Sequence, residues 1–136
     1  MMRAMKSASP NILHYIRAVS VWAFWPAVAL IVWGELTSHV PDIFFNIWDK
    51  ALHFTAYFGL AAMAWMALGG GRRGMWSIAG LIVLGGVLEI IQGQVGRDMS
   101  IWDEVANALG ASSGAFVAYC FVLALSARLV APTPAD

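Results

Sequence analysis

Ionisable and amide side chains occupy spaced positions within or next to apolar stretches of this sequence. They are Asp49, His53, Glu89, Gln92, Arg97, Asp103 and Asn107. A charged side chain at the centre of a bilayer costs about +2.5 to +3.5 kcal/mol on insertion scales, so such residues usually face other protein groups and often mark functional sites. Together, carboxylates, an imidazole and amides can hydrogen-bond a polar ligand or exchange protons with it.

Helical spacing places most of these side chains on two stripes. Each stripe follows a 4-3-4 pattern, one over Gly85, Glu89, Gln92 and Gly96 and the other over Asp103, Asn107, Gly110 and Gly114. Residues three and four apart share one face of a helix, so both stripes are polar and small and are predicted to face protein. Gly110 and Gly114 also form a GxxxG stretch, on which membrane helices approach closely. Asp49 and His53, which are four residues apart, complete the polar cluster.

Composition predicts the elements that carry these side chains. Of the 136 residues, 60% are hydrophobic and 12% are charged, and the mean hydropathy is +0.71. A soluble globule cannot bury so much apolar surface. Spanning the membrane takes about 20 helical residues, and the windows 18–36, 50–69, 75–95 and 103–127 qualify. We predict an all-α, polytopic membrane protein: a bundle of four transmembrane helices forming a single membrane domain over residues 1–136.

The basic residues predict the orientation of this bundle. Arg3, Lys6 and Arg17 precede the first span, Arg72 and Arg73 separate the second from the third, and Arg128 follows the fourth. Cytoplasmic segments carry the excess of Lys and Arg, so both termini are predicted to lie in the cytoplasm. The polar cluster then lies near the outer surface, just below the headgroups.

Two prolines predict local departures from straight spans. Pro26 lies inside the first span and predicts a kink there. The apolar segment 40–48 is interpreted as a short interfacial helix, started by Pro41, or as a re-entrant cover at the outer headgroup level.

The polar residues also have a purely structural interpretation. Ser100 and Asp103 match a capping box, so helix capping and the helix dipole account for Asp103 without a ligand. His53 can donate to Glu89 or Asp49 and hold two helices together. As a metal site, Asp49, His53 and Glu89 offer one nitrogen and two carboxylates. No metal is expected, however, because there is no HExxH motif and no second histidine within the spans. The sequence predicts no cofactor and no catalytic residue.

Taken in order, the same residues resemble the VanZ-like family of small bacterial membrane proteins. The match reads Asp49-Lys50-x-x-His53-Phe54-x-x-Tyr57-Phe58-x-Leu60, then Leu88-Glu89-x-x-Gln92, then Arg97-x-x-Ser100-x-x-Asp103-x-x-x-Asn107-x-x-Gly110-x-x-x-Gly114. The resemblance covers residues 49–119 and implies a multi-pass protein of the bacterial inner (cytoplasmic) membrane. It also implies that the polar residues of the match form the family's characteristic site on the outer side. The family is named after an accessory determinant of teicoplanin resistance, and the resemblance does not automatically imply that role.

Three functions remain open at this point. The leading hypothesis is an outer-leaflet polar pocket that binds or shields a polar group of an envelope molecule, either lipid-linked or of glycopeptide type. The second is a small accessory subunit that fills a gap in a larger membrane complex, respiratory or photosynthetic, which the seven Trp and seven Phe suit. The third is a lipid-active enzyme with His53 and Glu89 as acid and base, which the lack of a nucleophile disfavours.

Charge and hydropathy limit the classes of partner that this chain can have. Eight basic and eight acidic residues balance, which argues against a nucleic-acid partner. Membrane lipid is the partner that composition requires.

Overall fold

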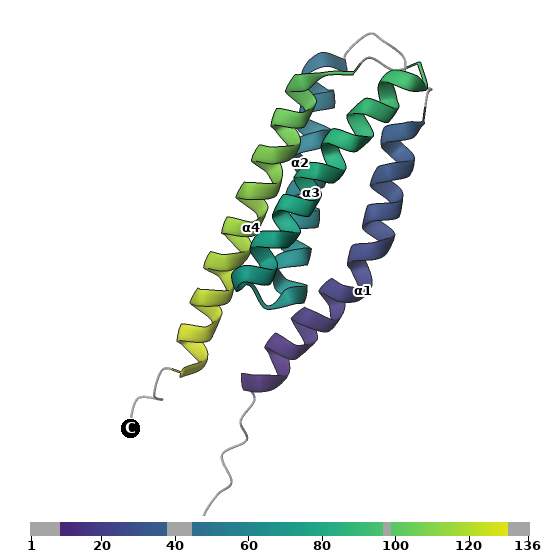
Figure 1. Ribbon diagram of the computed structural model, residues 1–136. Helices are drawn as coiled ribbons and strands as arrows, with labels where there is room; N and C mark the ends of the chain where they lie inside the picture. Colours follow the sequence, from purple (N-terminus) through teal and green to yellow (C-terminus); the bar gives the residue numbers. More distant parts are fainter. Residues whose placement is uncertain (1–8, 38–44, 97–98, 131–136) are drawn as a thin grey trace, which may run out of the picture.

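In the computed structural model, the described part of the chain forms a bundle of four α-helices (Figure 1). They are α1 (Ser9–Leu36), α2 (Phe45–Leu68), α3 (Gly71–Gln94) and α4 (Ile101–Val130). The structure describes residues 9–37, 45–96 and 99–130. All four helices are long and apolar enough to cross a membrane. The chain is therefore a multi-pass, all-α membrane protein, as its composition predicts.

Successive helices run in opposite directions along the bundle (Figure 1). The start of α1, the α2–α3 turn and the end of α4 consequently share one end, which we call the inner end because the basic residues predict that it faces the cytoplasm. The end of α1, the start of α2, the end of α3 and the start of α4 share the opposite, outer end. This topology determines which polar residues can meet.

The closest helix pair is α2 with α4. A Cβ atom added to Gly110 would overlap the backbone carbonyl oxygen of Phe54, and one added to Gly114 would overlap that of Phe58. The two contacts follow the same order in both helices, so α2 and α4 are parallel. The GxxxG stretch therefore packs on α2 and not on α3, its neighbour in sequence. Small residues favour this contact because helices in lipid associate through close packing.

Alanines pack with a few larger side chains at the centre of the bundle. The buried core cluster consists of Tyr57, Leu60, Ala61, Ala64, Leu81, Ala111 and Ala115. Large side chains such as Trp22, Trp33 and Phe116 instead remain exposed on the outer faces of the helices. This distribution suits a bundle whose surroundings are lipid.

Gly96 departs from the sequence-based expectation. The spacing places it on the packing stripe of α3, but that helix ends at Gln94 and Gly96 lies beyond it, exposed and with φ of 84°. A positive φ is the conformation that glycine adopts without steric cost just after a helix. Gly96 therefore ends α3 and does not pack against a neighbouring helix.

The first helix is longer than its predicted span and is bent. It begins at Ser9 instead of residue 18 and contains Pro26, and Figure 1 shows a bend part-way along it. Proline removes one backbone hydrogen bond and clashes with the preceding turn, which accounts for the bend. Of the predicted interfacial segment 40–48, residues 45–48 form the start of α2, and 40–44 lie outside the described residues.

Candidate functional site

Polar side chains from all four helices meet at the outer end of the bundle. Most of these side chains are buried between the helices, and they belong to segments long and apolar enough to span a membrane. We call this set the outer polar network; it comprises Glu35, Asp49, Lys50, His53, Glu89, Gln92, Asp103, Glu104 and Asn107. The structure thus brings together the residues singled out in the sequence, except that Arg97 lies outside the described residues.

Asn107 is at the centre of the network. Its side chain is completely buried. Its Nδ2 donates to Glu104 Oε2 over 3.3 Å, and its Oδ1 lies 3.0 Å from His53 Nδ1. Because the amide nitrogen is directed at Glu104, the amide oxygen is left to accept from His53, so Nδ1 of His53 carries a proton.

That hydrogen bond determines what the other His53 nitrogen presents. Nε2 lies 4.0 Å from Asp49 Oδ1, while Glu35 Oε1 lies 3.6 Å from Nδ1. In the neutral ring Nε2 is an acceptor, and in the imidazolium it is a second donor. His53 therefore lies between two carboxylates, with one ring nitrogen near each of them.

Lys50 supplies a fixed positive charge to the network. Its Nζ lies 3.2 Å from Asp103 Oδ1, with 34% of the Lys50 side chain exposed and 6% of that of Asp103. A buried carboxylate requires a partner of this kind, because an unpaired charge is strongly disfavoured away from water. The ion pair also joins the outer ends of α2 and α4.

Glu89 of α3 caps the first turn of α4. Its Oε2 accepts a hydrogen bond from the backbone N–H of Ser100 over 3.0 Å. In a capping box, the side chain three residues further on, here that of Asp103, would accept a hydrogen bond from this N–H. Glu89 takes that role across the helix interface, and Asp103 pairs with Lys50 instead. Glu89 Oε1 is buried and has no hydrogen-bond partner among the described residues.

Gly85 allows α4 to bring its polar side chains against α3. A Cβ atom at this position would lie 2.6 Å from Glu104 Oε2 and 2.8 Å from Asn107 Nδ2. The small residue of the α3 stripe thus makes room for the polar residues of the α4 stripe.

Glu35 is a member of the network that the sequence analysis missed. It is buried in the last turn of α1, and its backbone oxygen accepts from Gln92 Nε2 over 2.9 Å. These contacts join α1 to the other helices at the outer end. The available signal was an acidic residue close to the end of the first span, at the level where Asp49 begins the second.

Three residues of the network have the geometry to hold a cation. Asp49, His53 and Asp103 each place one ligand atom within 4.8 Å of the others. Asp103 thus replaces Glu89 in the set that the sequence suggested. The Lys50 ammonium already pairs with Asp103, so a metal ion would have to compete with that charge.

Comparisons with known proteins give no information on the role of the outer polar network. No protein-family model matches this chain, and no curated protein or solved structure shows significant similarity to it. The spaced residues alone carry the resemblance to VanZ-like proteins.

Proposed function

We propose that this chain is a VanZ-like protein of the bacterial cytoplasmic membrane. In this proposal, its outer polar network binds a donor-rich group of an envelope molecule, such as the amine or hydroxyl groups of a lipid-linked or glycopeptide-type ligand. The observation that carries the proposal is an excess of acidic groups at one buried level. The carboxyl groups of Glu35, Asp49, Glu89, Asp103 and Glu104 share the network with the ammonium group of Lys50 and the imidazole of His53.

The chemistry of the ligand follows from this excess. Carboxylates that are ionised accept hydrogen bonds and cannot donate them, so they favour ammonium and hydroxyl groups over anions. Glu89 Oε1, which is buried without a hydrogen-bond partner among the described residues, is suited to accept from such a donor. Asp49 and Lys50 are half-buried and form the accessible edge of the network. A ligand would therefore approach from the outer surface.

Loss of the Glu89 carboxylate tests this proposal. The purified protein in lipid nanodiscs would be titrated with teicoplanin and, separately, with a polyprenyl-phosphate-linked peptidoglycan precursor. A hydrogen bond to a charged group contributes about 1.5–3 kcal/mol, so Glu89→Ala is expected to weaken binding about ten- to a hundredfold. Glu89→Gln retains the shape of the side chain but not its charge, so its affinity should fall between those of the unchanged protein and of Glu89→Ala. Isothermal calorimetry gives the three affinities.

The control is Ser112→Ala, which changes an exposed hydroxyl of α4 outside the network. This variant should bind as the unchanged protein does. Gel filtration must show that the Glu89 variants remain folded. The proposal would be contradicted if the unchanged protein and its three variants bound a ligand with equal affinity. It would also be contradicted if the unchanged protein bound neither ligand.

A second candidate function is favoured by the surface of α1. Tyr15, Val19, Trp22, Trp25 and Trp33 of this helix are all exposed. Such an aromatic face suits contact with a larger membrane assembly, in which this chain would serve as an accessory subunit. Extraction of native membranes in a mild detergent would then yield the chain in a large complex. Replacing Trp22 and Trp33 with Leu should release it, and migration as a small free protein before any substitution would exclude this function.

A further inference from the structure

A groove opens at the inner end of the bundle, away from the outer polar network. It has a volume of about 450 Å³ and lies between the first turns of α1, the end of α2 and the second half of α4. This size is within the range of about 300–1,000 Å³ that is usual for small-molecule sites. Its place in the fold makes it independent of the function proposed above.

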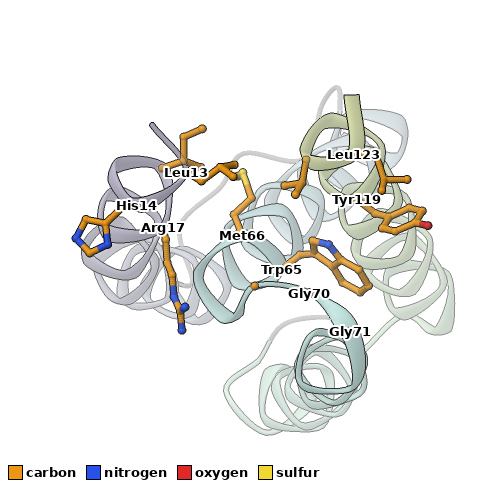
Figure 2. A pocket seen from close by; sticks show the side chains of 12 residues that line it. Leu13, His14, Arg17, Trp65, Met66, Gly70, Gly71, Tyr119 and Leu123 are labelled. Carbon is orange, nitrogen blue, oxygen red and sulfur yellow. The ribbon is translucent and has the colours of Figure 1, made fainter. Parts of the chain in front are cut away.

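The walls of the groove are apolar. Figure 2 shows Leu13 of α1 and Met66 of α2 projecting into the space between these helices, with Trp65 and Leu123 toward the α4 side. Leu123 is 51% exposed, so the groove is open to the surroundings of the bundle. In a membrane, such a surface is contacted by acyl chains.

A positive charge stands at one edge of the apolar surface. Arg17 lines the groove and extends beside it from α1, whereas His14 on the preceding turn points away from the bundle (Figure 2). Arg72 and Arg73, in the first turn of α3, add charge at the same end of the bundle. Basic clefts between transmembrane helices at the cytoplasmic side are suited to anionic lipid headgroups.

The depth of Arg17 agrees with a headgroup contact. Arg17 and Glu35 are separated along α1 by about 27 Å at 1.5 Å per residue, close to the hydrocarbon thickness of about 30 Å. Glu35 belongs to the network at the outer end. Arg17 therefore lies at the level of the inner headgroups, where phosphate is available.

We propose that the inner groove binds one anionic phospholipid from the cytoplasmic leaflet. An acyl chain lies between Leu13 and Met66, and the phosphate pairs with the guanidinium of Arg17. Arginine suits this task, because its planar donors match two phosphate oxygens at once. The occupant is a phospholipid and not free phosphate, because the groove beside the charge is apolar.

Native mass spectrometry of the detergent-purified protein tests the assignment. Phosphatidylglycerol and phosphatidylcholine with identical chains would be titrated in parallel. One Lys or Arg near an anionic surface contributes about 1 kcal/mol, so the unchanged protein is expected to prefer phosphatidylglycerol at least about fivefold. Arg17→Gln should remove that preference and leave binding of phosphatidylcholine unaltered.

The matched control is Arg128→Gln. Arg128 is also exposed at the inner end but does not line the groove, so its loss should leave the preference intact. A groove-filling variant, Leu13→Trp, should reduce retention of both lipids. If Arg17→Gln and Arg128→Gln reduced the preference for phosphatidylglycerol equally, the preference would come from diffuse surface charge and the proposal would be overturned. Equal affinity of the unchanged protein for the two lipids would also overturn it.

Discussion

Alanine at Gly110 is expected to destabilise the bundle by about 1–3 kcal/mol, the usual cost of overpacking. The added Cβ atom would overlap the carbonyl oxygen of Phe54, which belongs to the backbone of α2 and cannot rotate away as a side chain can. Relief requires α2 and α4 to move apart along their whole contact. The double variant Gly110→Ala with Gly114→Ala should be destabilised further, because the second site meets Phe58 in the same manner. Unfolding in mixed detergent micelles, followed by tryptophan fluorescence, measures the change.

Gly80→Ala is the matched control for this experiment. Gly80 lies in the middle of α3, and a Cβ atom there would have no atom within 4 Å. Alanine is favoured over glycine in helices by about 0.8–1.0 kcal/mol, so this variant should be unchanged or more stable. If Gly110→Ala proved as stable as Gly80→Ala, the close contact of α2 with α4 would be wrong.

The same contact illustrates what the sequence could and could not predict. The apolar windows predicted four spans, and the spacing of Asp103, Asn107, Gly110 and Gly114 predicted a buried face on the fourth. Periodicity identifies the face that is buried, but not the helix that covers it. The third and fourth spans are neighbours in sequence, whereas the GxxxG stretch of α4 packs on α2. Pairing of helices distant in sequence depends on shapes that a pattern does not contain.

The misplaced and missing residues have similar physical causes. Gly96 continues the spacing of Gly85, Glu89 and Gln92, but spacing alone does not reveal that the helix ends at Gln94. Glu35 was missed because the polar residues that it meets belong to other helices. The capping of Ser100 by Glu89 is likewise a contact between helices, whereas the capping-box pattern considers a single segment. Local rules describe each helix well, and they fail where a neighbouring helix supplies the partner.

Substitution of Asn107 by Ala is expected to cause the largest loss of stability within the outer polar network. Asn107 is fully buried and bonds to both His53 and Glu104. Its removal leaves two groups without this partner, and each buried polar group left unsatisfied costs about 1–3 kcal/mol. The same unfolding measurement in detergent micelles reports the change. Ser112→Ala, on an exposed face of the same helix, should leave stability within about 0.5 kcal/mol of the original.

A double-mutant cycle separates the hydrogen bond itself from the general effect of truncation. His53→Ala, Asn107→Ala and the double variant would be compared with the unchanged protein. Hydrogen bonds between helices in membranes contribute about 1–2 kcal/mol in model peptides, so the combined loss should fall short of the sum of the single losses by about that amount. Because Asn107 also determines which His53 nitrogen carries the proton, Asn107→Ala should alter the imidazole tautomer, which nitrogen-15 chemical shifts report. Additive losses together with unchanged imidazole shifts would refute this role of Asn107, since both results require that its amide oxygen not accept from His53.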